Sequence, residues 1–88
     1  MITGKTNSGF EFSLNENALD NMELVDALAE LQEDDPIAIS RVVRMLLGTA
    51  QRKRLYDHLR AEDGRVPLAA ISTAVSEIFG ALDQKGKN

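Results

Sequence analysis

The chain has 88 residues, of which 43% are hydrophobic and 27% are charged, a composition typical of one globular domain. It contains no cysteine, which excludes disulfides, thiolate metal sites and cysteine nucleophiles. No apolar run approaches the roughly 18 residues of a membrane span, and the first residues lack the apolar core of a signal peptide. The net charge is −4, but residues 1–40 carry nine acids and one base, whereas residues 41–65 carry seven bases and three acids. This asymmetry predicts either attraction within the fold or two surfaces of opposite charge.

Residues 1–14 have the pattern of a β-hairpin. Phe10, Phe12 and Leu14 alternate with polar residues, which places three apolar side chains on one face of a strand. Turn-forming residues at 7–9 separate this strand from a first strand over residues 2–6. Because an isolated two-stranded hairpin is marginally stable, its apolar face must rest on the helices. An exposed hairpin edge can also accept a strand from a partner.

A first helix is predicted to begin near Asp20, because Asp20 and Glu23 have the spacing of a capping box, with Glu16 as the alternative start. Its apolar face is expected to comprise Met22, Leu24, Val25, Leu28 and Leu31. Acidic residues also recur along it: Glu23, Asp26, Glu30 and Glu33. The carboxylates of such a stripe repel one another, so we expect the basic middle of the chain to lie nearby. Residues 33–35 are expected to form a polar turn.

The most apolar stretch, residues 36–47, is predicted to form a central helix that several other elements cover. Asp35 suits a cap, Pro36 the first helical position, and Gly48 the left-handed residue after the last turn. The apolar positions occupy more than half of the circumference: Ala38, Ile39, Val42, Val43, Met45, Leu46 and Leu47. The remaining polar stripe is narrow: Ser40, Arg41 and Arg44.

Two further helices are predicted after Gly48. The first follows a Thr49 cap and covers residues 50–62, with a thin apolar face: Ala50, Leu55, Tyr56 and Leu59. A turn at residues 63–65 leads to Pro67, which opens a last helix that extends to about residue 82. Its apolar stripe comprises Leu68, Ile71, Ala74, Val75, Ile78, Phe79 and Leu82. The predicted fold class is α+β, mainly helical, with an N-terminal β-hairpin packed on a bundle of about four helices.

No combination of residues in the sequence indicates catalysis or metal binding. His58 is the only histidine, so a metal would need surrounding carboxylates, and no such motif is present. The carboxylate pairs at residues 34–35 and 62–63 fall in polar turns, where capping and solubility explain them. The glycines form no phosphate-binding loop. We therefore expect no enzyme activity, no cofactor and no metal site.

Six short motifs stand in order along the chain: GFEFSL at 9–14, DNMELVDAL at 20–28, DPIA at 35–38, LLG at 46–48, YDHLR at 56–60 and EDGRVP at 62–67. In order and spacing they resemble the small tail assembly chaperones of long-tailed (siphovirus-type) bacteriophages and prophages. The resemblance covers most of residues 9–82. It implies a single tail-assembly-chaperone-like domain over residues 1–83, and residues 84–88 are expected to be a disordered polar tail.

The resemblance implies a non-enzymatic chaperone of tail morphogenesis in the host bacterial cytoplasm, absent from the mature virion. Such proteins bind the long, hydrophobic, helical tape measure protein, keep it soluble and help recruit the tail tube protein around it. The family often makes a longer form by ribosomal frameshifting, and Gly86, Lys87 and Asn88 are compatible with a slippery codon run.

Partner-binding residues are predicted among the basic stripe and the apolar side chains that the bundle leaves partly exposed: Arg41, Arg44, Met45, Arg52, Lys53, Tyr56 and Phe79. Met22 and the hairpin edge are further candidates. Self-association is also expected, because copies that each bind weakly can act through avidity when many are arrayed along one filament. No membrane partner is expected.

Two alternatives differ from the chaperone in class. The basic residues 52–54 and two helices joined at Gly48 loosely resemble a helix-turn-helix, as in a small phage DNA-binding or regulatory protein. The acidic balance and the scarcity of aromatic residues argue against nucleic acid. The other alternative is a generic protein–protein adaptor without a chaperone role.

Overall fold

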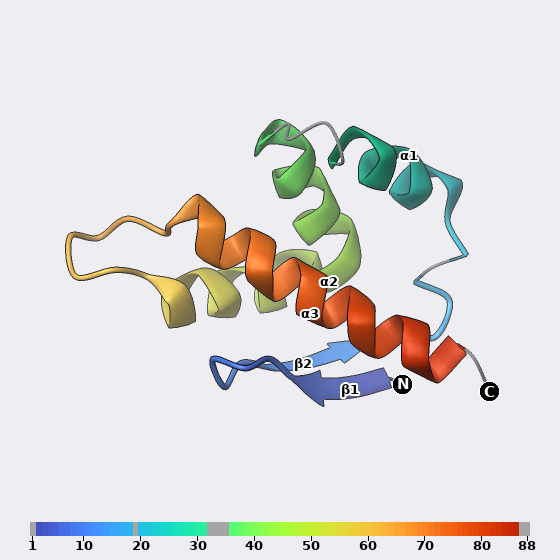
Figure 1. The fold of residues 1–88 in the computed structure, drawn as a ribbon, viewed down its shortest axis with the longest axis horizontal. Coiled ribbons are helices and arrows are strands. Elements are labelled where there is room, and N and C mark those ends of the chain that lie inside the picture. The colour runs from blue at the N-terminus through green and yellow to red at the C-terminus, as the bar shows by residue number, and fades with distance from the viewer. Residues whose placement is uncertain (1, 19, 32–35, 87–88) are drawn as a thin grey trace.

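The computed structural model describes residues 2–18, 20–31 and 36–86 (Figure 1). Along the chain, its elements are β1 (Ile2–Lys5), β2 (Glu11–Leu14), α1 (Met22–Leu31), α2 (Pro36–Leu59) and α3 (Leu68–Gly86). The hairpin lies along one side of α3, while α1 and the first part of α2 lie on the other (Figure 1). The predicted class, a mainly helical α+β fold with an N-terminal hairpin, is confirmed. Within the described ranges, no helix is both long and apolar enough to cross a membrane.

The expected number of about four helices is wrong, because the described residues form three. The predicted central helix and the helix after it are both parts of α2. Gly48 lies between them with φ 76° and ψ 178°, which is not a helical conformation. The two segments of α2 therefore run in clearly different directions (Figure 1). The predicted glycine break is real, but it is a kink inside one element.

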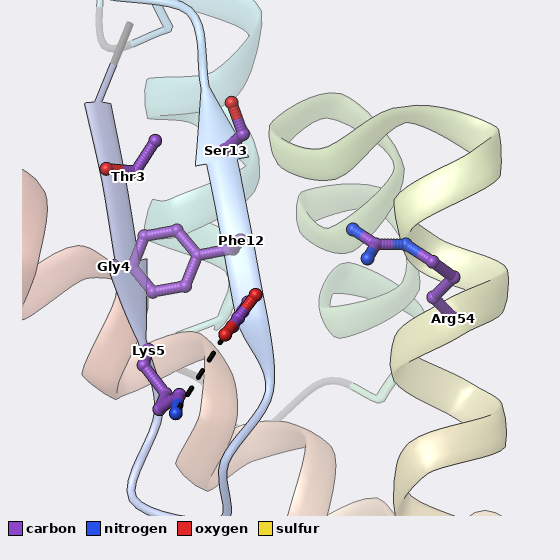
Figure 2. Close-up of a pocket in the computed structure, with 7 residues that line it drawn as sticks. Thr3, Gly4, Lys5, Phe12, Ser13 and Arg54 are labelled. Atoms are coloured by element: carbon purple, nitrogen blue, oxygen red, sulfur yellow. Dashed lines mark ion pairs between the residues drawn. The ribbon is translucent and has the colours of Figure 1, made fainter.

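The hairpin follows the predicted pattern closely. β1 and β2 are antiparallel, with Ile2 opposite Leu14 and Gly4 opposite Phe12. The ring of Phe12 lies over Gly4, where a Cβ atom would come within 2.6 Å of the ring Cζ (Figure 2). In the connecting loop, the Gly9 N–H donates to the Thr6 carbonyl at 2.9 Å. Gly9 has φ 97°, a conformation that glycine adopts without strain.

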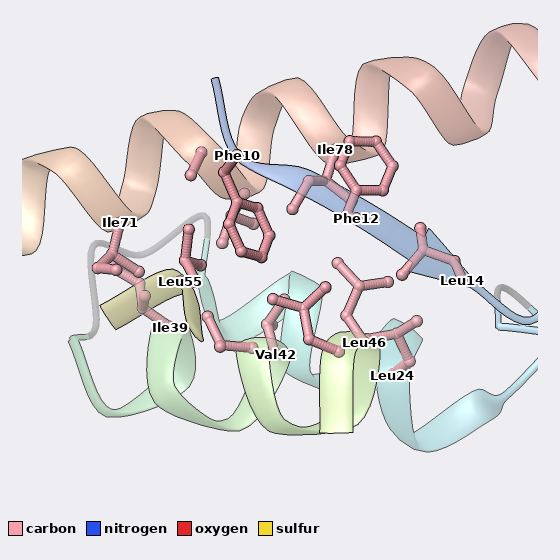
Figure 3. Packing of buried hydrophobic residues seen from close by; sticks show 14 of the residues in the cluster. Phe10, Phe12, Leu14, Leu24, Ile39, Val42, Leu46, Leu55, Ile71 and Ile78 are labelled. Carbon is pink, nitrogen blue, oxygen red and sulfur yellow. The ribbon is translucent and has the colours of Figure 1, made fainter. Parts of the chain in front are cut away.

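Every helix and strand β2 contribute to one apolar core (Figure 3). Its most deeply buried large side chains are at most 1% exposed and include Leu14, Leu24, Val42, Leu55 and Ile78. The predicted faces of the hairpin and of the first α2 segment are confirmed, since Phe10, Phe12, Ala38, Ile39, Val42, Val43, Leu46 and Leu47 are also buried. The second α2 segment contributes Leu55 alone to the fully buried set, while Ala50 is exposed.

Helix α1 differs from the prediction in its start and in its apolar face. The side-chain Oδ1 of Asn21, rather than Asp20, caps the helix by accepting the Glu23 N–H at 3.0 Å. Leu24 and Ala27 are buried, but Met22 is 69% and Val25 46% exposed. The expected cap at Asp35, the carboxylate of Glu33 and the turn at 33–35 lie outside the described residues.

The second half of the chain differs from prediction mainly at its helix ends. Helix α2 ends at Leu59, and the turn that follows has Gly64 at φ 91°. Asp63 accepts hydrogen bonds from the side chain of Arg65 at 2.7 Å and from its backbone N–H at 3.0 Å, which lowers the pKa of Asp63. Helix α3 continues to Gly86, so residues 84–86 of the expected disordered tail are helical. Leu68, expected on the apolar face, is 50% exposed.

Candidate protein-binding surfaces

The second segment of α2 lies along the outer edge of β2. The Gln51 side chain bonds the backbone of Ser13 twice, because its Oε1 accepts the Ser13 N–H at 2.8 Å and its Nε2 donates to the Ser13 carbonyl at 2.7 Å. The same Nε2 donates to the Leu47 carbonyl at 3.1 Å. One side-chain amide thus replaces a neighbouring strand and covers part of the β2 edge.

Two further side chains on the same face of α2 contact the hairpin. The Arg54 guanidinium lies 5.4 Å from the centre of the Phe10 ring, a cation–π distance. The His58 ring lies 6.0 Å from the Phe10 ring, and its Nε2 is 3.0 Å from the Ser8 carbonyl. His58 therefore helps hold the hairpin loop against α2.

Replacing Gln51 with leucine is expected to lower the free energy of unfolding by about 1–2 kcal/mol, because the two hydrogen bonds between the Gln51 amide and the Ser13 backbone are lost. The replacement of Arg52 by leucine is the matched control, since Arg52 is the next residue and has no hydrogen bond or ion pair among the described residues. Chemical denaturation measures the stability, and amide hydrogen exchange at Ser13 measures the local effect. Unchanged protection of the Ser13 amide in Q51L would contradict this account.

An open depression of about 550 Å³ lies between the hairpin and α2 (Figure 2). It is lined by Thr3, Gly4, Lys5, Glu11, Phe12, Ser13 and Arg54. Its only ion pair within the described residues joins Lys5 Nζ to Glu11 at 3.9 Å, and both side chains are well exposed. Such a pair contributes little energy. The depression therefore has a mixed lining, in which the Phe12 ring lies beside the polar side chains of Lys5, Glu11 and Arg54.

The residues predicted to bind a partner fall into three groups in the structure. Arg41, Arg44 and Met45 belong to the first segment of α2, whereas Arg52, Lys53 and Tyr56 belong to the second segment, beyond the kink. Phe79 lies on α3. Within residues 2–18, 20–31 and 36–86, no hydrogen bond or ion pair joins these groups to one another. The apolar members are half-buried against the core, as filler side chains would be: Met45, Tyr56 and Phe79.

Among the described residues, the acidic stripe of α1 meets the basic part of the chain at Glu30. Arg41 Nη1 lies 3.0 Å from Glu30 Oε2 and 3.2 Å from Glu30 Oε1. Together with Glu23 and Asp26, these two residues line a second open depression, of about 420 Å³. The expected attraction between the two halves of the chain is therefore present at Glu30. Glu23 and Asp26 have no ion-pair partner within the part of the chain that is described.

Among the side chains that the structure describes, four large apolar ones are strongly exposed: Met22, Val25, Ile37 and Leu68, at 46–73%. The sequence prediction named only Met22 as a partner contact and assigned Val25 and Leu68 to buried faces. Leucine, isoleucine and valine at helical spacing indicate a buried face whether or not another element covers it. Within the described ranges, no group of three His, Asp or Glu residues is placed to hold a metal ion.

No protein-family model, curated protein or solved structure matches this chain. The resemblance to tail assembly chaperones therefore stays a prediction from the sequence motifs.

Proposed function

We propose that this protein is a non-enzymatic tail assembly chaperone of a long-tailed phage or prophage. It binds the tape measure protein in the host cytoplasm, keeps it soluble, helps recruit the tail tube protein and is left out of the mature virion. The sequence motifs suggest this role. The structural observation that supports it most is the exposure of four large apolar side chains among the described residues of a small, acidic domain: Met22, Val25, Ile37 and Leu68.

The physical basis of this activity is the covering of another protein's apolar helices. A tape measure protein presents long amphipathic helices, and each one needs only a small apolar contact to be shielded from other copies. Individual contacts of this size are weak, but many chaperone copies on one filament bind through avidity. The net charge of −4 on each copy then keeps the complex soluble.

The nucleic-acid alternative has less support from the arrangement of charge. Three of the seven bases in residues 41–65 already face carboxylates: Arg41 at 3.0 Å from Glu30, Arg60 at 3.1 Å from Asp57, and Arg65 at 2.7 Å from Asp63. The acidic residues of α1 also lie beside Arg41 and would repel phosphate.

Co-expression with the tape measure protein encoded in the same gene cluster tests the proposal. We expect the soluble fraction of the tape measure protein to rise several-fold, and the two proteins to elute together in size-exclusion chromatography. An unrelated acidic domain of similar size, expressed from the same vector, is the control. If the tape measure protein is as insoluble with this protein as with the control domain, the chaperone function is wrong.

A further inference from the structure

The outer face of α1 combines an apolar stripe with a line of carboxylates. Helix α1 packs mainly on α2, through Leu24, Ala27 and Leu28. At about 100° per residue, Met22, Val25 and Ala29 fall within about 60° of one another, and the centre of this stripe lies about 140° around the helix from the centre of the packed face. All three are exposed, Met22 at 69% and Val25 at 46%. Figure 1 shows α1 at the periphery of the molecule, where a partner can reach it.

The carboxylates run along one border of this apolar stripe. Asp26, Glu30 and Glu23 follow it in that order around the helix, at about 40–100° from Met22. They line the depression of about 420 Å³ together with Arg41. Among the described residues, Arg41 pairs with Glu30 alone, so the carboxylates of Glu23 and Asp26 give this border a net negative charge. Oxygen atoms from three carboxyl groups around an open depression suit the ammonium or guanidinium group of a partner.

We infer that this face of α1 binds an amphipathic helix whose apolar stripe is bordered by lysine or arginine. The inference rests on the proposed function and names the class of tape measure segment that the chaperone recognises. Side chains such as leucine on the partner helix cover Met22 and Val25, while its basic residues lie against Glu23 and Asp26. Helix-on-helix packing of this kind is read through residues spaced three and four apart.

The charge of the border selects the partner, and the apolar stripe supplies the contact area. A helix with glutamates in place of lysines would set like charges against Glu23 and Asp26, which disfavours binding. A basic helix without apolar residues would leave Met22 and Val25 exposed to water. Both features must therefore be present in the partner.

Three synthetic helices of about 18 residues provide the probes. One has leucines on one face bordered by lysines, the second has glutamates in place of the lysines, and the third keeps the lysines but has glutamine in place of leucine. Affinity is measured by fluorescence anisotropy, and the site by amide chemical shifts of the isotope-labelled full chain. We expect the leucine–lysine helix to bind at least about tenfold more tightly than the other two. The amide shift changes that this helix causes in the labelled chain should concentrate in residues 22–30.

Variants of the chain separate the two parts of the surface. The double variant M22Q/V25Q is expected to weaken binding of the leucine–lysine helix at least about fivefold, whereas L68Q, which alters an exposed apolar residue on α3, should leave it unchanged. The charge-reversal variant E23K/D26K is expected to prefer the leucine–glutamate helix. Amide shifts outside α1, equal losses for M22Q/V25Q and L68Q, or an unchanged preference in E23K/D26K would each overturn the inference.

The co-expression assay distinguishes failure of this inference from failure of the proposed function. If the natural chain and M22Q/V25Q keep the tape measure protein equally soluble, the α1 surface is wrong and the chaperone function stands. If the natural chain fails to keep it soluble while the leucine–lysine helix binds α1 as described, the chaperone function is wrong and the α1 surface serves another partner.

Discussion

Replacing Ile78 with alanine is expected to lower the free energy of unfolding by about 3–4 kcal/mol, the largest effect of any substitution considered for this chain. Ile78 is 0% exposed and lies in the core cluster between α3 and the hairpin (Figure 3). Truncation removes three carbon atoms from packed surroundings and leaves a cavity that the helix backbone cannot fill. A domain of this size has a total stability of only about 4–13 kcal/mol, so the loss is a large share of it.

Thermal and denaturant unfolding followed by circular dichroism measure this effect, with an expected fall in Tm of at least about 12 °C. Truncation of Leu68 to alanine on the same helix is the control, because that side chain is 50% exposed and should lose less than about 1 kcal/mol. Equal losses of unfolding free energy for the Ile78 and Leu68 truncations would show that α3 is not packed through Ile78.

Alanine substitutions at two glycines are expected to change stability in opposite directions. Gly48 has φ 76° and ψ 178°, which an alanine adopts only with strain, so G48A should lose about 1–3 kcal/mol. No atom lies within 4 Å of the position of an added Cβ, which excludes a clash as the cause. The chain cannot avoid the strain by straightening α2, because Leu55 would then leave the core, where it is 0% exposed.

Gly80 provides the matched substitution. It lies within α3 without a positive φ, and an added Cβ also meets no atom within 4 Å. Alanine there should raise the free energy of unfolding by about 0.5–1 kcal/mol, because it reduces the freedom of the unfolded chain. Denaturant titrations of both variants give the comparison. A stability gain in G48A similar to that in G80A would mean that the kink at Gly48 is absent from the protein in solution.

The parts of the fold that the sequence predicted well are those set by local patterns. Alternation of Phe10, Phe12 and Leu14 with polar residues predicted the hairpin, and the position of Gly9 predicted its turn. The dense apolar pattern of residues 36–47 predicted the helix at the centre of the core. In each case the spacing of neighbouring residues fixes both the element and its buried face.

The features that the sequence did not predict depend on contacts between distant residues. Met22 and Val25 have the helical spacing of a buried face, but α1 packs on α2 through its other side. Gln51 bonds the backbone of Ser13, 38 residues earlier in the chain, and no local pattern marks such a contact. The predicted number of helices was wrong, because a glycine such as Gly48 can either end a helix or join two helical segments at a kink.

The candidate surface was predicted less well than the fold. The basic and apolar residues proposed from the sequence are divided by the kink in α2, and three of them are half-buried in the core: Met45, Tyr56 and Phe79. The exposed stripe on α1 shares its composition with a core-facing stripe, so only the tertiary arrangement distinguishes the two.

Suppression of aggregation by the purified protein is the most direct measurement of the chaperone role. A tape measure fragment is diluted from denaturant, and light scattering is recorded at increasing molar ratios of this protein. We predict that scattering falls in proportion to the ratio until the fragment is covered. Scattering no lower than with an equal amount of an unrelated acidic domain of the same size would contradict the central claim, that this small domain shelters the apolar helices of another protein.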